Sequence, residues 1–142
     1  MQIVEVSFIS PLVCAIVNMI LGGAIWYNPK TPIGKAWMKE SGVKMGNMTE
    51  KQKKMMGVSY FIAFVCAYVM AYVLGHVLAF AETQTYGEAL QGAFWMWLGF
   101  VATVGTGVVL WEGKSWKLWA INTGYYLVAM LIMSAILFGM GL

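Results

Sequence analysis

The chain has 142 residues, of which 61% are hydrophobic and 11% are charged, with a formal net charge of +3. Soluble domains average about 25% charged residues, so this composition excludes an ordinary soluble domain and indicates one integral membrane domain, residues 1–142. The two cysteines and the single histidine have no spacing that suits zinc, haem or an iron–sulfur cluster. We therefore expect neither a metal site nor another cofactor.

Four apolar stretches follow one another along the chain, at about residues 8–27, 57–80, 89–111 and 118–140. About 20 apolar residues in a helix cross the hydrocarbon core of a bilayer. The sequence therefore predicts an all-α fold, an integral membrane four-helix bundle. No lysine precedes the first stretch, unlike the start of a signal peptide, so we expect that segment to remain in the mature protein. Trp26 and Tyr27 at its far end are typical of interfacial aromatic residues.

The first loop, residues 28–55, is the longest polar stretch. Thr31 and Pro32 can open a short helix that places Trp37 towards lipid with lysines at its rim, as in an interfacial helix. Thr49 and Gln52 have the spacing of a capping box, which predicts that the second helix begins in water before it enters the bilayer.

All nine lysines lie in the first and third loops. Cytoplasmic loops of membrane proteins carry the excess of positive charge. The distribution thus predicts a multi-pass protein of the bacterial inner membrane, with both termini outside and the short helix in the first cytoplasmic loop.

Small residues recur at four-residue steps in the second and third apolar stretches, where they permit another helix to approach closely. In the second stretch they are Ala63, Ala67, Ala71 and Gly75, and in the third they are Gly99, Thr103 and Gly107. Since the loop between these stretches is short, we expect the second and third helices to pack most closely.

Polar groups inside the apolar stretches are candidate ligand or transport residues. Tyr68, Tyr72 and His76 share one face of the second helix. They could line a path for a proton or a small solute, or could hydrogen-bond to backbone carbonyls as packing groups. Asn18 and Asn122 could join helices by hydrogen bonds or line a polar cavity.

A second candidate region is the third loop with the aromatic residues at its edges. It contains Trp111, Glu112, Lys114 and Trp116, and Trp37 of the first loop completes the cytoplasmic interface. Glu112 could hold the loop by pairing with Lys114 or Lys117, could accept hydrogen bonds at the start of the fourth helix, or could contact a lipid headgroup. Attraction to anionic lipids explains the lysines, so we expect the bilayer and no nucleic acid as a partner.

Several motifs resemble a known bacterial membrane family, described as domain of unknown function 1761. They are residues 23–29 (Gly-Ala-Ile-Trp-Tyr-Asn-Pro), 34–38, 97–100, 111–118 and 121–125. The resemblance covers nearly the whole chain and implies a small four-helix membrane protein, with no catalytic residue to carry over.

The small-residue tracks and the lack of catalytic motifs favour a non-enzymatic protein that works by helix association, as a homo-oligomer or as an accessory subunit of a larger membrane complex. The alternative is a transporter or channel for a small solute or proton, lined by the face of Tyr68, Tyr72 and His76. An enzyme acting on lipid or quinone through Glu112 and lysines is the weakest interpretation, because no second acid or base lies at a suitable spacing.

Overall fold

The computed structural model describes residues 5–43 and 49–142, and its regular elements are all helical. In chain order they are α1 (Ile9–Ile20), the π-helical turn η1 (Leu21–Trp26), α2 (Pro32–Ser41), α3 (Glu50–Phe80), α4 (Tyr86–Trp97), the π-helical turn η2 (Leu98–Ala102), α5 (Thr103–Leu110) and α6 (Trp116–Gly139). The described residues contain four continuous helices long and apolar enough to cross a membrane: Ile9–Trp26, Glu50–Phe80, Tyr86–Leu110 and Trp116–Gly139. The all-α prediction with four long apolar helices and a short helix in the first loop is confirmed.

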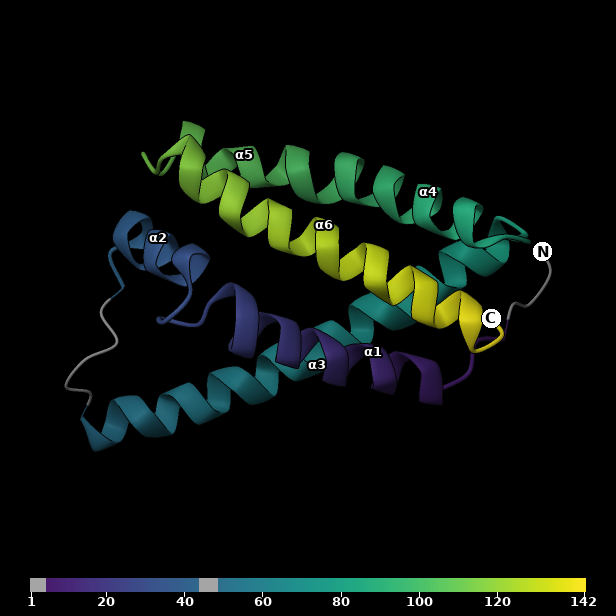
Figure 1. Ribbon diagram of the computed structural model, residues 1–142, viewed down its shortest axis with the longest axis horizontal. Helices are drawn as coiled ribbons and strands as arrows, with labels where there is room; N and C mark the ends of the chain where they lie inside the picture. Colours follow the sequence, from purple (N-terminus) through teal and green to yellow (C-terminus); the bar gives the residue numbers. More distant parts are fainter. Residues whose placement is uncertain (1–4, 44–48) are drawn as a thin grey trace.

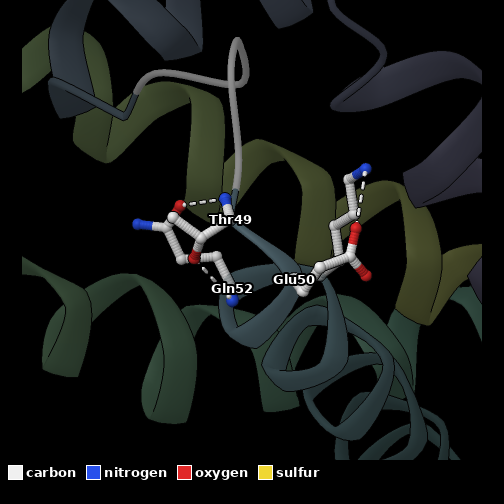
Figure 2. Close-up of polar contacts among 4 residues, drawn as sticks. Thr49, Glu50 and Gln52 are labelled. Carbon is white, nitrogen blue, oxygen red and sulfur yellow. Dashed lines mark hydrogen bonds and ion pairs between the residues drawn. The ribbon is translucent and has the colours of Figure 1, made fainter.

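Capping boxes begin two of the long helices. At the start of α3, the backbone N–H of Gln52 donates to Thr49 Oγ1 at 3.2 Å, and Gln52 Oε1 accepts from the backbone N–H of Thr49 at 2.9 Å (Figure 2). Thr85 and Glu88 form the same reciprocal arrangement before α4. These caps satisfy backbone donors that have no partner within the helix, so local sequence defines where both helices begin.

The four long helices form two pairs of packed neighbours (Figure 1). The first rod consists of α1 and η1, and its α1 part packs along α3. The third rod, formed by α4, η2 and α5, runs beside α6. α3 meets α4 only near the turn that joins them and has no packing contact with α5. The prediction that the second and third helices pack most closely is therefore wrong, because each has a different main partner.

One of the two small-residue tracks faces the interior and the other does not. Ala67, Ala71 and Gly75 are buried, and a Cβ added at Gly75 would lie 3.0 Å from Val6 and 3.5 Å from Leu137 of α6. On the same track, Ala63 is exposed. The inner part of the α3 track thus packs against the start of the chain and α6.

The track in the third rod is turned outward. Gly99 and Thr103 are exposed, and a Cβ added at Gly99 would meet nothing within 4 Å. The rod instead presents another small face to α6, where Ala102 is buried and a Cβ at Gly105 would lie 2.9 Å from Thr123. The expectation that the track joins the helices of this chain is wrong, since a neighbouring row of small residues makes that contact.

The two ends of the bundle differ in packing. We define the closed end as the part of the bundle where α1 and α4 begin and where α3 and α6 end. The main core lies towards this end. Its buried members are Cys14, Ala15, Ala67, Ala71, Leu74, Leu78, Ala89, Ala93, Met130, Met133 and Leu137. The open end contains η1, α2, the first turns of α3, α5 and the start of α6, and there every residue of 50–63 except Met56 is exposed.

Candidate functional site: an aromatic cleft at the open end

The π-helical turn η1 aims two aromatic side chains at α6. The backbone N–H of Tyr27 donates to the carbonyl of Gly22 at 2.8 Å, five residues back. Such a turn accommodates one extra residue and changes the direction of the side chains that follow. Trp26 Nε1 then donates to the carbonyl of Ile121 at 2.9 Å, and the Tyr27 hydroxyl donates to Asn122 Oδ1 at 3.0 Å. Both rings thus fasten helices together, so reading them only as interfacial aromatic residues was incomplete.

A tightly bonded loop connects η1 to α2. Asn28 Oδ1 accepts from the backbone N–H of Lys30 at 2.9 Å, and Thr31 Oγ1 accepts from the backbone N–H of Gly34 at 3.1 Å, which caps α2. A Cβ at Gly34 would clash with the backbone carbonyl of Asn28, so this position requires glycine. The loop brings the Trp37 ring edge-on to Tyr27, with the ring centroids 5.1 Å apart.

A hydrogen bond holds the far end of α2 against α6. The Ser115 hydroxyl donates to Glu40 Oε2 at 2.6 Å and accepts from the backbone N–H of Leu118 at 3.1 Å. The carboxylate therefore lies at the N-terminus of α6, where negative charge is favourable. Sequence reasoning missed Glu40 because its partner is 75 residues away.

Glu112 does not have the predicted partners. It is exposed, and among the described side chains it forms no ion pair with Lys114 or Lys117. Trp111 is 87% exposed and Trp116 is 56% exposed, so the rings beside the third loop face outward. Of the three roles considered for Glu112, the ion pair is therefore not formed, and Glu40 provides the carboxylate that contacts the start of α6.

Asn18 and Asn122 both join the first rod to α6. The Tyr125 hydroxyl donates to Asn18 Oδ1 at 2.7 Å, and the Tyr27 hydroxyl donates to Asn122 Oδ1. A Cβ at Gly22 would lie 3.0 Å from the Tyr125 hydroxyl oxygen, so the glycine leaves room for the phenol. Two tyrosine–asparagine pairs thus link helices that are about a hundred residues apart in sequence.

Around these pairs, three adjoining cavities lie between α3 on one side and η1, α5 and α6 on the other. Their volumes are ≈ 440, 580 and 360 Å³, within the range of small-molecule sites. We call this region the aromatic cleft and define it by the shared or facing residues Asn18, Tyr27, Trp37, Tyr60, Ala63, Met70, Asn122, Tyr125 and Tyr126. Within the part of the chain that the structure describes, no charged side chain lines any of the three cavities.

The tyrosine hydroxyls of the cleft remain hydrogen-bond donors. Tyr27 lies one residue beyond the first apolar helix, and burial raises the pKa of its hydroxyl, with the nearby phenols of Tyr126 and Tyr125 raising it further. The hydroxyl therefore stays protonated at neutral pH and keeps donating to Asn122.

Tyr68, Tyr72 and His76 lie outside the aromatic cleft. The Tyr68 hydroxyl donates to the carbonyl of Phe8 at 3.1 Å, and the Phe8 ring stacks on Tyr72 with centroids 5.7 Å apart. His76 Nδ1 lies 2.9 Å from the Tyr72 carbonyl oxygen, which can only accept, so this nitrogen carries the proton in the hydrogen bond. Tyr68 and His76 thus have backbone carbonyls as their hydrogen-bond partners, and Tyr72 packs on the Phe8 ring.

Within the described residues, no group of three histidine, cysteine or acidic side chains is placed to hold a metal ion. The chain matches, over residues 9–138, the family described as protein of unknown function (DUF1761). No curated protein and no solved structure matches it. The match covers the residues that build α1 to α6 and the aromatic cleft, and the chain belongs to this family.

Proposed function

We propose that the chain is a non-enzymatic protein of the bacterial inner membrane that works by helix association, with a second copy of itself as the partner. The lysines of the first and third loops face the cytoplasm and anionic lipids, and both termini face outward. Closed symmetric dimers are the commonest oligomers.

The outward track of the third rod supports this proposal. Gly99 and Thr103 are exposed, and a Cβ at Gly107 would meet only Trp111 of the same chain. The Thr103 hydroxyl donates to the carbonyl of Gly99 at 2.7 Å, so it leaves no unsatisfied donor at a helix interface. A track of this kind lets two identical helices approach closely in lipid.

The burial of the third rod supports the same conclusion. In the most apolar window of Tyr86–Leu110 only 11% of the residues are buried, compared with 39% in Trp116–Gly139. The third rod is therefore peripheral within one chain and has a free surface for a neighbour. The packing of Phe8 on Tyr72 and its hydrogen bond with Tyr68 argue against a transport path along Tyr68, Tyr72 and His76.

Isoleucine substitutions in the track test the association. Gly99→Ile places bulk on the proposed interface, and Gly57→Ile is the matched control, since a Cβ at Gly57 also meets nothing within 4 Å. We expect Gly99→Ile to weaken dimerisation in mild detergent by about fivefold, in line with typical interhelical energies of about 1 kcal/mol. A monomeric wild type, or equal dimerisation of both variants and wild type, contradicts the proposal.

Cysteine accessibility tests the orientation. In a Cys66→Ala background, Lys51→Cys in the first loop should be protected from an impermeant maleimide in intact cells, whereas Gln84→Cys between α3 and α4 should react. Labelling of Lys51→Cys from outside would reverse the proposed topology.

A further inference from the structure

We propose that the aromatic cleft binds a neutral, lipid-soluble molecule with a flat ring that carries carbonyl oxygens, of which a quinone is the simplest example. The cleft is built within one chain, so the proposal does not depend on dimerisation. It uses the face of α3 that turns towards α6, whereas the proposed dimer contact is the outward face of the third rod.

The electrostatics of the cleft select an uncharged ligand. Among residues 5–43 and 49–142, no lysine, glutamate or histidine lines the three cavities, so a phosphate or a carboxylate would meet no counter-charge from these walls. Burial of an unpaired charge is strongly unfavourable. The described lysines are exposed, and none of them lines a cavity.

The polar groups of the cleft select a ligand with acceptor atoms. The amide oxygens of Asn18 and Asn122 already accept from Tyr125 and Tyr27, and the hydrogen bonds of the described residues use neither amide nitrogen. Each amide therefore keeps N–H donors for an acceptor, and a ring carbonyl oxygen is an acceptor that carries no charge.

The shape and composition of the walls favour a ring. The Trp37 and Tyr27 rings meet edge-on, and the Tyr125 and Tyr126 rings meet in the same way at 5.2 Å, which fixes the aromatic side of the cleft. Tyr60 and Ala63 of α3 line the cleft from the other side. Aromatic walls of this kind bind a flat ring by offset stacking or edge contacts. An apolar tail on the ligand can leave the cleft along the exposed first half of α3.

The test uses the full chain in phosphatidylcholine nanodiscs with decylubiquinone, a fully substituted benzoquinone that does not add to thiols. Ala63→Leu fills the cleft from α3 without removing any hydrogen bond. Ala120→Leu is the matched control, because Ala120 is an exposed alanine of α6 outside all three cavities. Dioctanoylglycerol, an uncharged ester lipid, provides carbonyl groups without a ring.

We expect decylubiquinone at about 100 times its Kd to raise the unfolding temperature of the wild type and of Ala120→Leu by about 9 °C, with no shift for Ala63→Leu. Dioctanoylglycerol should shift none of them. An absent shift in the wild type, or an equal shift in Ala63→Leu, would overturn the site. An equal shift with dioctanoylglycerol would overturn the assignment to a flat ring. Loss of dimerisation in Ala63→Leu would also overturn it, since a neighbouring helix would then occupy the cleft.

Discussion

The closed and open ends of the bundle use different side chains to hold the same helices together. At the closed end, alanine, glycine and cysteine let α1, α3, α4 and α6 approach one another, and leucine and methionine fill the remaining space. At the open end, aromatic rings and asparagine amides join η1, α2 and α6, while the first turns of α3 stay uncovered. Small residues close a bundle in lipid, whereas rings held by single hydrogen bonds leave room for a cleft.

The connection between η1 and α2 should give the largest effect. Gly34→Ala places a Cβ against the backbone of Asn28, which cannot move aside as a flexible side chain could. We expect a loss of about 3 kcal/mol in unfolding free energy, together with a red shift of Trp37 emission as the ring leaves Tyr27. Gly23→Ala is the control, because its Cβ would meet nothing within 4 Å. Equal stability of the two variants would mean that the loop is not packed as described.

The second-largest effect should come from a substitution in the core of the closed end. Leu137 is fully buried, and Leu137→Ala leaves a cavity between α6 and its neighbours. Lipid is as apolar as the core, so the substitution costs mainly the free energy of forming the cavity. We therefore expect the unfolding free energy measured in refolding experiments to fall by about 2 kcal/mol. Ile62→Ala, at a 54% exposed site of α3 near the open end, should change the free energy by less than about 0.5 kcal/mol. Similar losses at both sites would remove the distinction between the two ends.

A double-mutant cycle measures one tyrosine–asparagine pair. Asn18→Ala and Tyr125→Phe each remove one side of the 2.7 Å hydrogen bond, and we expect a coupling energy of about 1 kcal/mol. A coupling near zero would show that the amide and the phenol act independently.

The smallest effect distinguishes the carboxylate of Glu40 from that of Glu112. Glu40→Gln weakens a charge-assisted hydrogen bond to Ser115 and removes a negative charge from the start of α6. We therefore expect the unfolding free energy to fall by about 0.5–1 kcal/mol. Glu112→Gln, at an exposed side chain, should change stability by less than about 0.3 kcal/mol. The opposite order would restore the role that the sequence suggested for Glu112.

Local features of the fold could be predicted from sequence and distant ones could not. The capping boxes at Thr49 and Thr85 depend on residues three apart, and the apolar stretches are continuous, so helix starts and the number of long helices were accessible. The sequence did not show which face of the third rod turns inward. The row of Ala102 and Gly105 lies beside the Gly99 track, and both rows suit close packing.

The aromatic cleft was missed for a related reason. Tyr27 and Asn122 are 95 residues apart, and nothing in one sequence pairs them. The signal that was present lies in the two aromatic motifs that end the first rod and begin α6. Placement at the membrane interface explains Trp26 and Tyr27 in the sequence equally well. Only the π-helical turn shows that their side chains point at α6.

Distances between spin labels in lipid test most directly the claim that one end is closed and the other open. In a Cys66→Ala background, one pair joins exposed positions of α3 and α5 at the open end (Ile62 and Leu110), and the other joins α3 and α4 at the closed end (Phe80 and Leu90). We expect the open-end pair to be clearly farther apart, beyond the 8–10 Å or so that separates the axes of packed helices. Equal short distances would place α3 against α5 and contradict the cleft.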